Sequence, residues 1–187
     1  MKPEILSSRT IYTGKVFDIS VAEIREGQAF YQREIVNHHG SAVIIPVFDD
    51  NTIAFVRQYR HAAGEYLLEI PAGTLQENES PESGAVRELE EEIGFKAKNI
   101  EKLSEFYVSP GFLTEKMNLF LATELTETAQ NPDTDEFIEI EIISFEEAFA
   151  KIGNGEIKDA KTIIGVLLTA AKLGITYKTQ PRLDLKT

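Results

Sequence analysis

The chain contains no cysteine, which excludes a disulfide framework, a thiolate nucleophile and any cysteine-based metal site. Because such a chain fits a reducing compartment, we expect a cytoplasmic protein. Long apolar runs are also missing: the longest, Thr162 to Ala171, is about half of the roughly 20 residues that span a bilayer. That run predicts a buried helix, and residues 1–10 lack the apolar region of a signal peptide. We therefore expect no membrane partner.

Positive charge is scarce as well. The chain has 31 acidic and 19 basic residues, a net charge of −12, and no basic patch, which argues against a nucleic-acid partner. An acidic protein that binds an anionic substrate needs a cation between the two. A metal ion held by clustered carboxylates would supply that cation, so the position of such a cluster becomes the central question.

The 187 residues suffice for one well-packed domain with a small appendage, and a hydrophobic share of 42% is ordinary for a globular protein. Apolar periodicity and turn residues divide the chain into elements. We predict strands at 16–24, 30–36, 41–48, 52–59, 65–73, 103–108, 116–124 and 137–144, and helices at 81–93, 145–152 and 159–173. This order predicts an α+β layer arrangement. An N-terminal antiparallel sheet would occupy residues 1–40 and the main domain residues 41–187.

The clearest helix is the one at 81–93. Ser80 is a suitable N-cap, Pro81 suits the first helical position, and Gly94 provides a C-terminal stop. At about 100° per residue, the apolar side chains gather on one face, which we expect to pack on the sheet. These side chains are Val86, Leu89 and Ile93.

Another face of this helix carries Glu88, Glu91 and Glu92. Like charges at these spacings repel one another, and the macrodipole disfavours anions near a helix C-terminus. A divalent cation reverses this balance, because Mg²⁺ seeks oxygen ligands. Gly84, one turn earlier on the same face, would let a loop or a ligand approach closely. The alternative is a solvated charged face, which is the common meaning of an acidic run.

Residues 73–95 resemble the Nudix box. The family pattern is Gly, five residues, Glu, seven residues, Arg-Glu-apolar, one residue, Glu-Glu, one residue, Gly-apolar. Its fixed positions are all filled here, by Gly73, Glu79, Arg87, Glu88, Leu89, Glu91, Glu92, Gly94 and Phe95. The strand order around the box also resembles the Nudix α/β/α sandwich with a mixed sheet, so we expect that fold.

The resemblance implies a hydrolase that acts on a nucleoside diphosphate linked to another group, with two or three Mg²⁺ ions, or Mn²⁺, as cofactor. The implied metal ligands are Glu88 and Glu92, assisted by Glu91, Glu79 and the backbone carbonyl of Ala72. Glu91 would also take part in catalysis, and Arg87 would orient the carboxylates. Such ions can screen the diphosphate and activate a water, so a protein nucleophile is not needed.

Features outside the box resemble the ADP-ribose pyrophosphatase group. They are Pro110, sixteen positions after Gly94, and the segments 69–73 (EIPAG), 57–60 (RQYR) and 32–36 (QREIV). This resemblance implies that ADP-ribose is cleaved to AMP and ribose 5-phosphate. GDP-mannose or another nucleoside diphosphate sugar is an alternative substrate, and a non-catalytic nucleotide-binding regulator is an alternative of another class. Pro110 could also mark a simple Pro-Gly turn.

The same resemblance implies substrate contacts for several residues. Arg60 and Arg57 suit phosphates, since a guanidinium fork matches phosphate oxygens; the alternative for each is an ion pair with a nearby glutamate. Arg33 would reach phosphate or ribose, in one arrangement from a second subunit. Phe17 would stack on adenine, against the alternative of core packing. Pro110 completes the implied substrate-binding set.

The acidic loop 126–136 is expected to supply the catalytic base, with Glu136 as the best match and Asp135 next. A loop carboxylate can swing in when substrate binds, whereas the alternative is a solvated loop. We assign no catalytic role to the histidines, which are His38, His39 and His61.

We also expect a homodimer. The N-terminal strands, about 40 residues, are too few to form a core alone. In the enzymes that this chain resembles, the sheet is exchanged between subunits and helps to build both sites.

Overall fold

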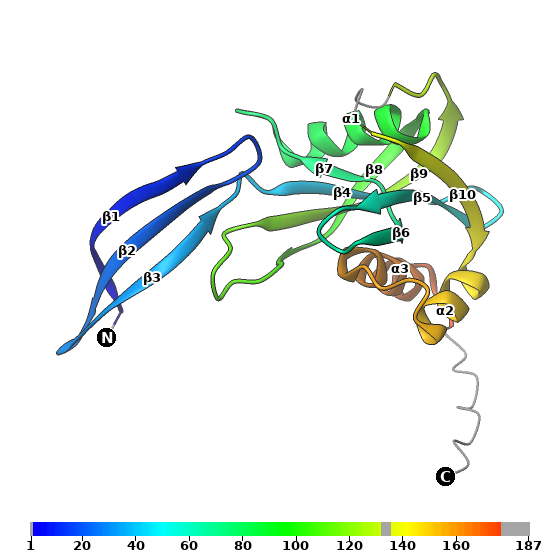
Figure 1. The fold of residues 1–187 in the computed structure, drawn as a ribbon. Coiled ribbons are helices and arrows are strands. Elements are labelled where there is room, and N and C mark those ends of the chain that lie inside the picture. The colour runs from blue at the N-terminus through cyan, green and yellow to red at the C-terminus, as the bar shows by residue number, and fades with distance from the viewer. Residues whose placement is uncertain (1, 132–135, 177–187) are drawn as a thin grey trace, which may run out of the picture.

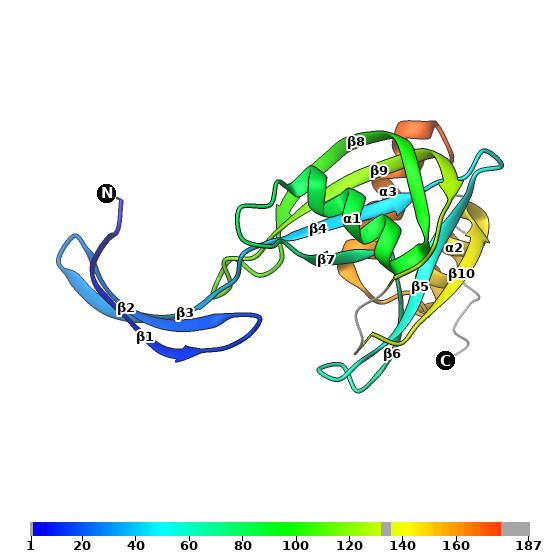
Figure 2. The ribbon, with the colours of Figure 1, turned by 90° about the horizontal axis from the view of Figure 1, so that it is seen from above.

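A three-stranded sheet projects as an arm from the rest of the chain (Figures 1 and 2). The structure is a computed structural model, and it describes residues 2–131 and 136–176. The arm consists of β1 (Glu4–Thr13), β2 (Asp18–Glu26) and β3 (Ala29–Asn37), which pair antiparallel in that order. The end of β3 is tied to a loop of the body, where the Val36 N–H donates to Phe112 O at 2.8 Å.

The arm has almost no core of its own. Every residue of β1 is exposed, and within residues 4–37, all of them described, Ala22 is the single buried apolar side chain. The large exposed apolar side chains of the arm are Ile5, Leu6, Ile11, Tyr12, Val16, Phe17 and Phe30. A small sheet that buries so little apolar surface is marginally stable by itself, so its stability depends on contacts beyond it.

The body contains a mixed four-stranded sheet with the order β7-β4-β9-β8. Its strands are β4 (Ser41–Pro46), β7 (Ala72–Thr74), β8 (Phe95–Tyr107) and β9 (Lys116–Glu127). β4 and β9 pair parallel, and the other pairs are antiparallel. A second, antiparallel sheet has the order β10-β5-β6, formed by β5 (Thr52–Arg60), β6 (Glu65–Glu69) and β10 (Ile138–Ser144).

Helices cover both faces of the body. β4 is buried along its whole length, so its side chains point alternately into two cores. Ala42 and Ile44 join α1 (Pro81–Ile93) in one core. Val43 and Ile45 join α2 (Phe145–Asn154) and α3 (Ala160–Leu173) in the other. Two cores on opposite faces of a sheet form an α/β/α sandwich, which confirms the predicted fold class.

The ends of α1 are those predicted from the sequence. Ser80 Oγ accepts a hydrogen bond from the Ser83 N–H at 3.1 Å and caps the helix. Gly94 ends it with a φ of 69°, in the left-handed region that favours glycine. Local capping chemistry therefore places the helix independently of the rest of the fold.

The face of α1 that packs on the sheet differs from the prediction. Val86 is 43% exposed, whereas Ala85 and Leu89 are fully buried. The expectation for Val86 was wrong because the helix is rolled about its axis. Its buried side is centred between the apolar stripe and the carboxylates, so Glu88 and Glu92 are buried too. The alternative of a wholly solvated acidic face is thereby excluded.

Other predicted elements are present with shifted ends. The predicted strand 65–73 is divided at Ile70-Pro71, because proline lacks the N–H needed to continue a ladder. Its two pieces, β6 and β7, join different sheets. The predicted strand 103–108 begins much earlier as β8, where Phe95 already pairs with Glu127 of β9. No helix in the described ranges is long and apolar enough to cross a membrane.

Candidate active site

A cleft of about 1080 Å³ opens beside the carboxylate side of α1. Its other walls come from the β1–β2 turn of the arm, the β5–β6 hairpin, β7 with the loop that follows it, and residues 136–137 just before β10. These segments are far apart in the sequence. Only the tertiary fold brings them together.

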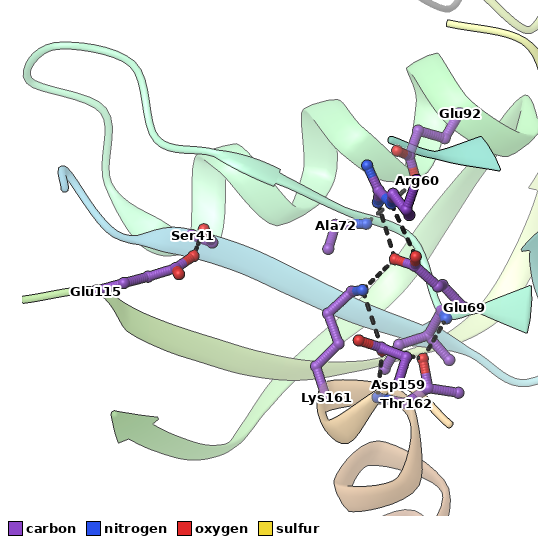
Figure 3. Close-up of polar contacts among 10 residues, drawn as sticks. Ser41, Arg60, Glu69, Ala72, Glu92, Glu115, Asp159, Lys161 and Thr162 are labelled. Carbon is purple, nitrogen blue, oxygen red and sulfur yellow. Dashed lines mark hydrogen bonds and ion pairs between the residues drawn. The ribbon is translucent and has the colours of Figure 1, made fainter. Parts of the chain in front are cut away.

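Glu88 lines this cleft and Glu92 lies behind it, one turn further along α1, with 7% and 1% of their surfaces exposed. Glu92 Oε2 accepts a hydrogen bond from the Ala72 N–H at 3.1 Å, which joins the helix to β7 (Figure 3). The carboxylate of Glu88 lies over Gly73: a Cβ at position 73 would be 1.8 Å from Glu88 Oε1. Only glycine leaves room for the carboxylate there.

Burial makes the charged forms of these two carboxyls unfavourable. It raises the pKa of Glu88 to about 7, although the neighbouring Arg87 charge lowers it. The pKa of Glu92 is raised well above its ordinary value by burial, and further by the charges of Glu88 and Glu136. Glu136 therefore lies close enough to act electrostatically on both. Ionised together, these three carboxylates would repel one another, and a bound cation would stabilise their charged forms.

Arg87 organises the outer carboxylates of α1. Its guanidinium donates to both oxygens of Glu79, from Nε at 2.8 Å and from Nη2 at 3.0 Å. Its Nη1 donates to Glu88 at 2.6 Å and to Glu91 at 2.8 Å. These bonds lower the pKa of Glu79 and raise that of Arg87. Because Glu79 also accepts the Gln76 N–H at 2.9 Å, it positions Arg87 and fixes the loop before the helix.

Gly84 lets that loop lie directly against α1. A Cβ at position 84 would be 2.8 Å from Leu75 Cδ2 and 3.2 Å from Glu79 Oε2. The close approach predicted for this glycine is thus made by the loop itself.

The carboxylates fit a hard divalent cation in donor type and in charge. Within the described ranges, however, no three acidic or histidine side chains converge into a ready-made metal site. Glu88 and Glu91 are turned to Arg87, and Glu92 is bonded to the Ala72 N–H. Binding a cation would exchange these bonds for metal bonds and relieve the repulsion between Glu88, Glu92 and Glu136.

The predicted arginines lie on opposite sides of β5. Arg60 lines the cleft and donates from Nε and Nη2 to the two oxygens of Glu69, both at 2.8 Å (Figure 3). Arg57 is not among the cleft residues, and its Nε donates to Glu141 of β10. Strand residues alternate between faces, so positions 57 and 60 point apart. Both arginines pair with a glutamate, and only Arg60 also reaches the cleft.

Three other residues predicted to contact substrate do not line the cleft of their own chain. Phe17 is 40% exposed, and its ring centroid lies 5.9 Å from that of Tyr12 within the arm. Arg33 lies on β3, with its guanidinium 4.3 Å from the centre of the Tyr31 ring. Pro110 lines a separate cavity of about 460 Å³.

Two charged residues enter the cleft from remote segments. Glu136, which the sequence predicted as the catalytic base, reaches it just before β10. The other carboxylate predicted for this role, Asp135, lies outside the described residues. Lys15, which the sequence did not single out, enters from the β1–β2 turn. The sequence shows that Lys15 follows Gly14 at a turn, but it does not show that this turn lies beside the cleft.

The β5–β6 hairpin adds polar and aromatic groups, of which sequence reasoning missed Gln58, Tyr59 and Tyr66 and considered His61 only as a non-catalytic neighbour of Arg60. Gln58 is buried, and its Oε1 is one of two buried side-chain atoms without a hydrogen-bond partner in the described ranges. The ring of Tyr59 meets His61 and Tyr66 edge to face, with centroids 5.0 and 5.2 Å apart. All four residues line the cleft. Alternation along β5 puts Gln58 on the same face as Arg60, a signal that could have identified it.

Comparison with known proteins agrees with this geometry. Residues 38–164 match the NUDIX domain. The chain is 39% identical to ADP-ribose pyrophosphatase of Bacillus subtilis, over 89% of this chain and 91% of that protein. It is 38% identical to a methanol dehydrogenase activator of Bacillus methanolicus, over 92% and 95% of the two chains. It is 33% identical to GDP-mannose pyrophosphatase of Yersinia enterocolitica, over 82% of each.

A solved structure has the same fold. The crystal structure of an ADP compounds hydrolase superposes with a TM-score of 0.82 over 94% of this chain and 98% of that one, at 20% identity. The resemblance of residues 73–95 to the Nudix box is therefore confirmed by relatives that cover most of the chain and by the fold. Taken with the buried carboxylate pair of α1, these matches show that the chain belongs to the NUDIX family.

Proposed function

We propose that the protein hydrolyses the diphosphate bond of ADP-ribose to AMP and ribose 5-phosphate, with Mg²⁺ as cofactor. The observation that carries this proposal is the buried pair Glu88 and Glu92, whose charges disfavour each other and of which Glu88 lines a cleft that also presents Arg60. The named activity of the Bacillus subtilis relative supports the choice of substrate. The negative charge of a diphosphate in this cleft would be neutralised by Arg60 on one side and by carboxylate-bound cations on the other.

The α1 carboxylates would hold the metal. Glu88 and Glu92 are the main ligands, with Glu91 and the Ala72 carbonyl assisting, and two or three ions fit the number of carboxylates. A bound divalent ion supplies charge neutralisation at the diphosphate and a more acidic water. Arg87 keeps Glu88 and Glu91 in place through the hydrogen bonds that it donates.

Glu136 would take the proton of the attacking water, and Arg60 would bind a phosphate oxygen. Glu136 stands at the cleft, close enough to raise the pKa of Glu88. In-line attack on a diphosphate depends on orientation more than on a protein nucleophile, so the proposal requires no nucleophilic side chain. The unpartnered Oε1 of Gln58 would accept a hydrogen bond from a substrate hydroxyl in the same cleft.

We also propose that residues 1–40 mediate a homodimer and contact the substrate of the partner chain, while residues 41–187 form the hydrolase domain. The exposed apolar side chains of the arm, such as Phe30 at 70% exposure, support this role. Phe17 and Arg33, which lie away from the cleft of their own chain, would reach the partner's cleft. Light scattering at micromolar concentration tests the proposal, and a monomeric wild type would reject it.

A substrate panel tests the activity. Purified protein with Mg²⁺ is given ADP-ribose, GDP-mannose and ADP-glucose, and the products are measured by phosphate release after phosphatase treatment. We expect ADP-ribose to be cleaved fastest; faster cleavage of GDP-mannose would favour the activity named for the Yersinia enterocolitica relative. Nucleotide binding without turnover of any of the three would favour the regulator instead.

The Glu92→Gln variant tests the site. It removes a proposed metal ligand from a buried position, so turnover should be lost. Glu90→Gln is the matched control, since Glu90 lies on the same helix but pairs with Lys96 outside the cleft. Unchanged turnover in Glu92→Gln would reject the assignment of the metal site.

A further inference from the structure

Glu69 is a buried carboxylate with two cationic partners. It is 2% exposed, accepts the paired N–H groups of Arg60 on the cleft side, and contacts Lys161 Nζ of α3 on the other side (Figure 3). Burial alone would raise the pKa of Glu69, but the hydrogen bonds and charges of Arg60 and Lys161 outweigh it and lower the pKa to about 2. Glu69 is therefore an anion at neutral pH, shared between an arginine at the cleft and a lysine in the interior.

Lys161 occupies a position that is unfavourable for a lysine, because it is buried and lies at a helix N-terminus. It is 6% exposed and is the second residue of α3, where the helix dipole disfavours a cation. Its Nζ contacts Glu69 and lies 3.0 Å from Asp159 Oδ2. Thr162 Oγ1 donates to Asp159 at 2.6 Å and accepts the Ile70 N–H at 2.9 Å, which fixes the start of α3 to the end of β6. Packed backbone thus holds Lys161 against Glu69.

The balance of charge shows what the lysine contributes. Arg60 and Glu69 alone form a pair of zero net charge, so Glu69 would cancel much of the attraction of Arg60 for an anion. Lys161 offsets Glu69 from the interior and is shared with Asp159, whose negative charge is also stabilised by the Thr162 N–H at 3.0 Å and the Thr162 hydroxyl at 2.6 Å at the helix N-terminus. Glu69 occupies two of the guanidinium's five N–H donors. The remaining donors of Arg60 can then present positive charge to the cleft.

We propose that Lys161 is a positioning residue for substrate binding: by neutralising Glu69 from behind, it lets Arg60 keep a fixed orientation and still attract the diphosphate. Lys161 itself does not touch the substrate, and it lies outside the 73–95 box. The inference rests on the proposed function, since it takes a diphosphate to be the anion of the cleft.

Lys161→Met tests this inference. We expect the KM for ADP-ribose to rise by about tenfold or more while kcat stays within about threefold, because a screened charge acts on binding of the anion rather than on the metal-bound reacting centre. Calorimetry with a methylene-bridged ADP-ribose analogue should show the same loss of affinity. Lys158→Met is the matched control: Lys158 Nζ pairs with Glu65 at 2.7 Å on the surface, and its loss should leave both values unchanged.

A double variant separates this role from a merely structural one. Lys161→Met/Glu69→Gln removes the buried anion together with its counter-charge, so most of the lost affinity should return. An unchanged KM in Lys161→Met, or a double variant as weak as the single one, would overturn the inference. Should Lys161→Met not fold, Glu69→Gln and the double variant are compared instead. Without the Glu69 anion there is no negative charge for Lys161 to neutralise. Equal KM values for Glu69→Gln and the double variant therefore support the inference, and a higher KM in the double variant refutes it.

Failure of the proposed function would look different. The wild type would then turn over none of the nucleoside diphosphate sugars. In that case the affinity of inorganic diphosphate for the wild type and for Lys161→Met measures the role of the lysine without turnover. Binding that is about tenfold weaker in the variant supports the inference, and equal binding overturns it.

Discussion

Gly73→Ala should remove catalysis while leaving the fold intact. The added Cβ would lie 1.8 Å from Glu88 Oε1, 2.2 Å from Cδ and 2.6 Å from Oε2. Gly73 does not have a left-handed backbone, so alanine is conformationally acceptable there. The three atoms nearest to the added Cβ all belong to the carboxylate that we propose as a metal ligand.

The structure sets the size of the effect. To reach an ordinary contact of 3.4 Å, Glu88 Oε1 has to move by about 1.6 Å. A misplacement of about 1 Å at a reacting centre costs roughly 100-fold in rate, so we expect kcat to fall by about 100-fold or more. The carboxylate ends a flexible side chain, and burial already disfavours its charge, so moving it costs little stability. Replacing glycine contributes about 0.4–1 kcal/mol through the unfolded state, which partly offsets the lost Arg87 bond.

The assay compares kcat and the melting temperature of wild type, Gly73→Ala and Gly111→Ala. Gly111 is the matched control, because an added Cβ there meets no atom within 4 Å. We expect Gly73→Ala to melt within about 4 °C of wild type. Retention of kcat to within about threefold in Gly73→Ala would refute the placement of Glu88, as would an equal loss in Gly111→Ala.

Three further predictions concern Glu88, the two arginines of β5 and Thr162. The pKa of Glu88 is raised from 4.5 to about 7, so its contribution to stability is fully present below pH 4.5 and is lost as the pH rises through 7. With chelator present, the free energy of unfolding of Glu88→Gln should therefore rise relative to that of wild type by up to about 3 kcal/mol as the pH increases from 4.5 to 8, as measured by denaturant titration. A difference between the two proteins that does not change with pH would contradict this. Arg60→Met should raise KM by about tenfold or more. Arg57→Met removes only partly exposed ion pairs with Glu141 and Glu156, each worth at most about 1 kcal/mol, and should leave KM unchanged; equal KM values for the two variants would count against the placement of both arginines. Thr162→Val leaves the buried Ile70 N–H unpaired and should lower the free energy of unfolding by about 1–3 kcal/mol, and a loss below about 0.5 kcal/mol would disprove that account.

The sequence alone determined the features that arise within a few residues. The ends of α1 follow from Ser80, Pro81 and Gly94, and the carboxylate cluster follows from its spacing on one helix. Capping and side-chain periodicity act over one or two turns, so they can be read without knowing the fold. The family pattern of residues 73–95 depends on the same local spacing.

Tertiary structure alone decided which side chains are buried and which meet. It rolled α1 so that Val86 is exposed, and of the two arginines that strand alternation places on opposite sides of β5 it brought only Arg60 to the cleft. It also paired Glu69 with Lys161, 92 positions further along the chain. Such contacts depend on how separate layers pack against one another. No periodicity or local spacing in the sequence carries that information, because each partner is positioned by a different element of the fold.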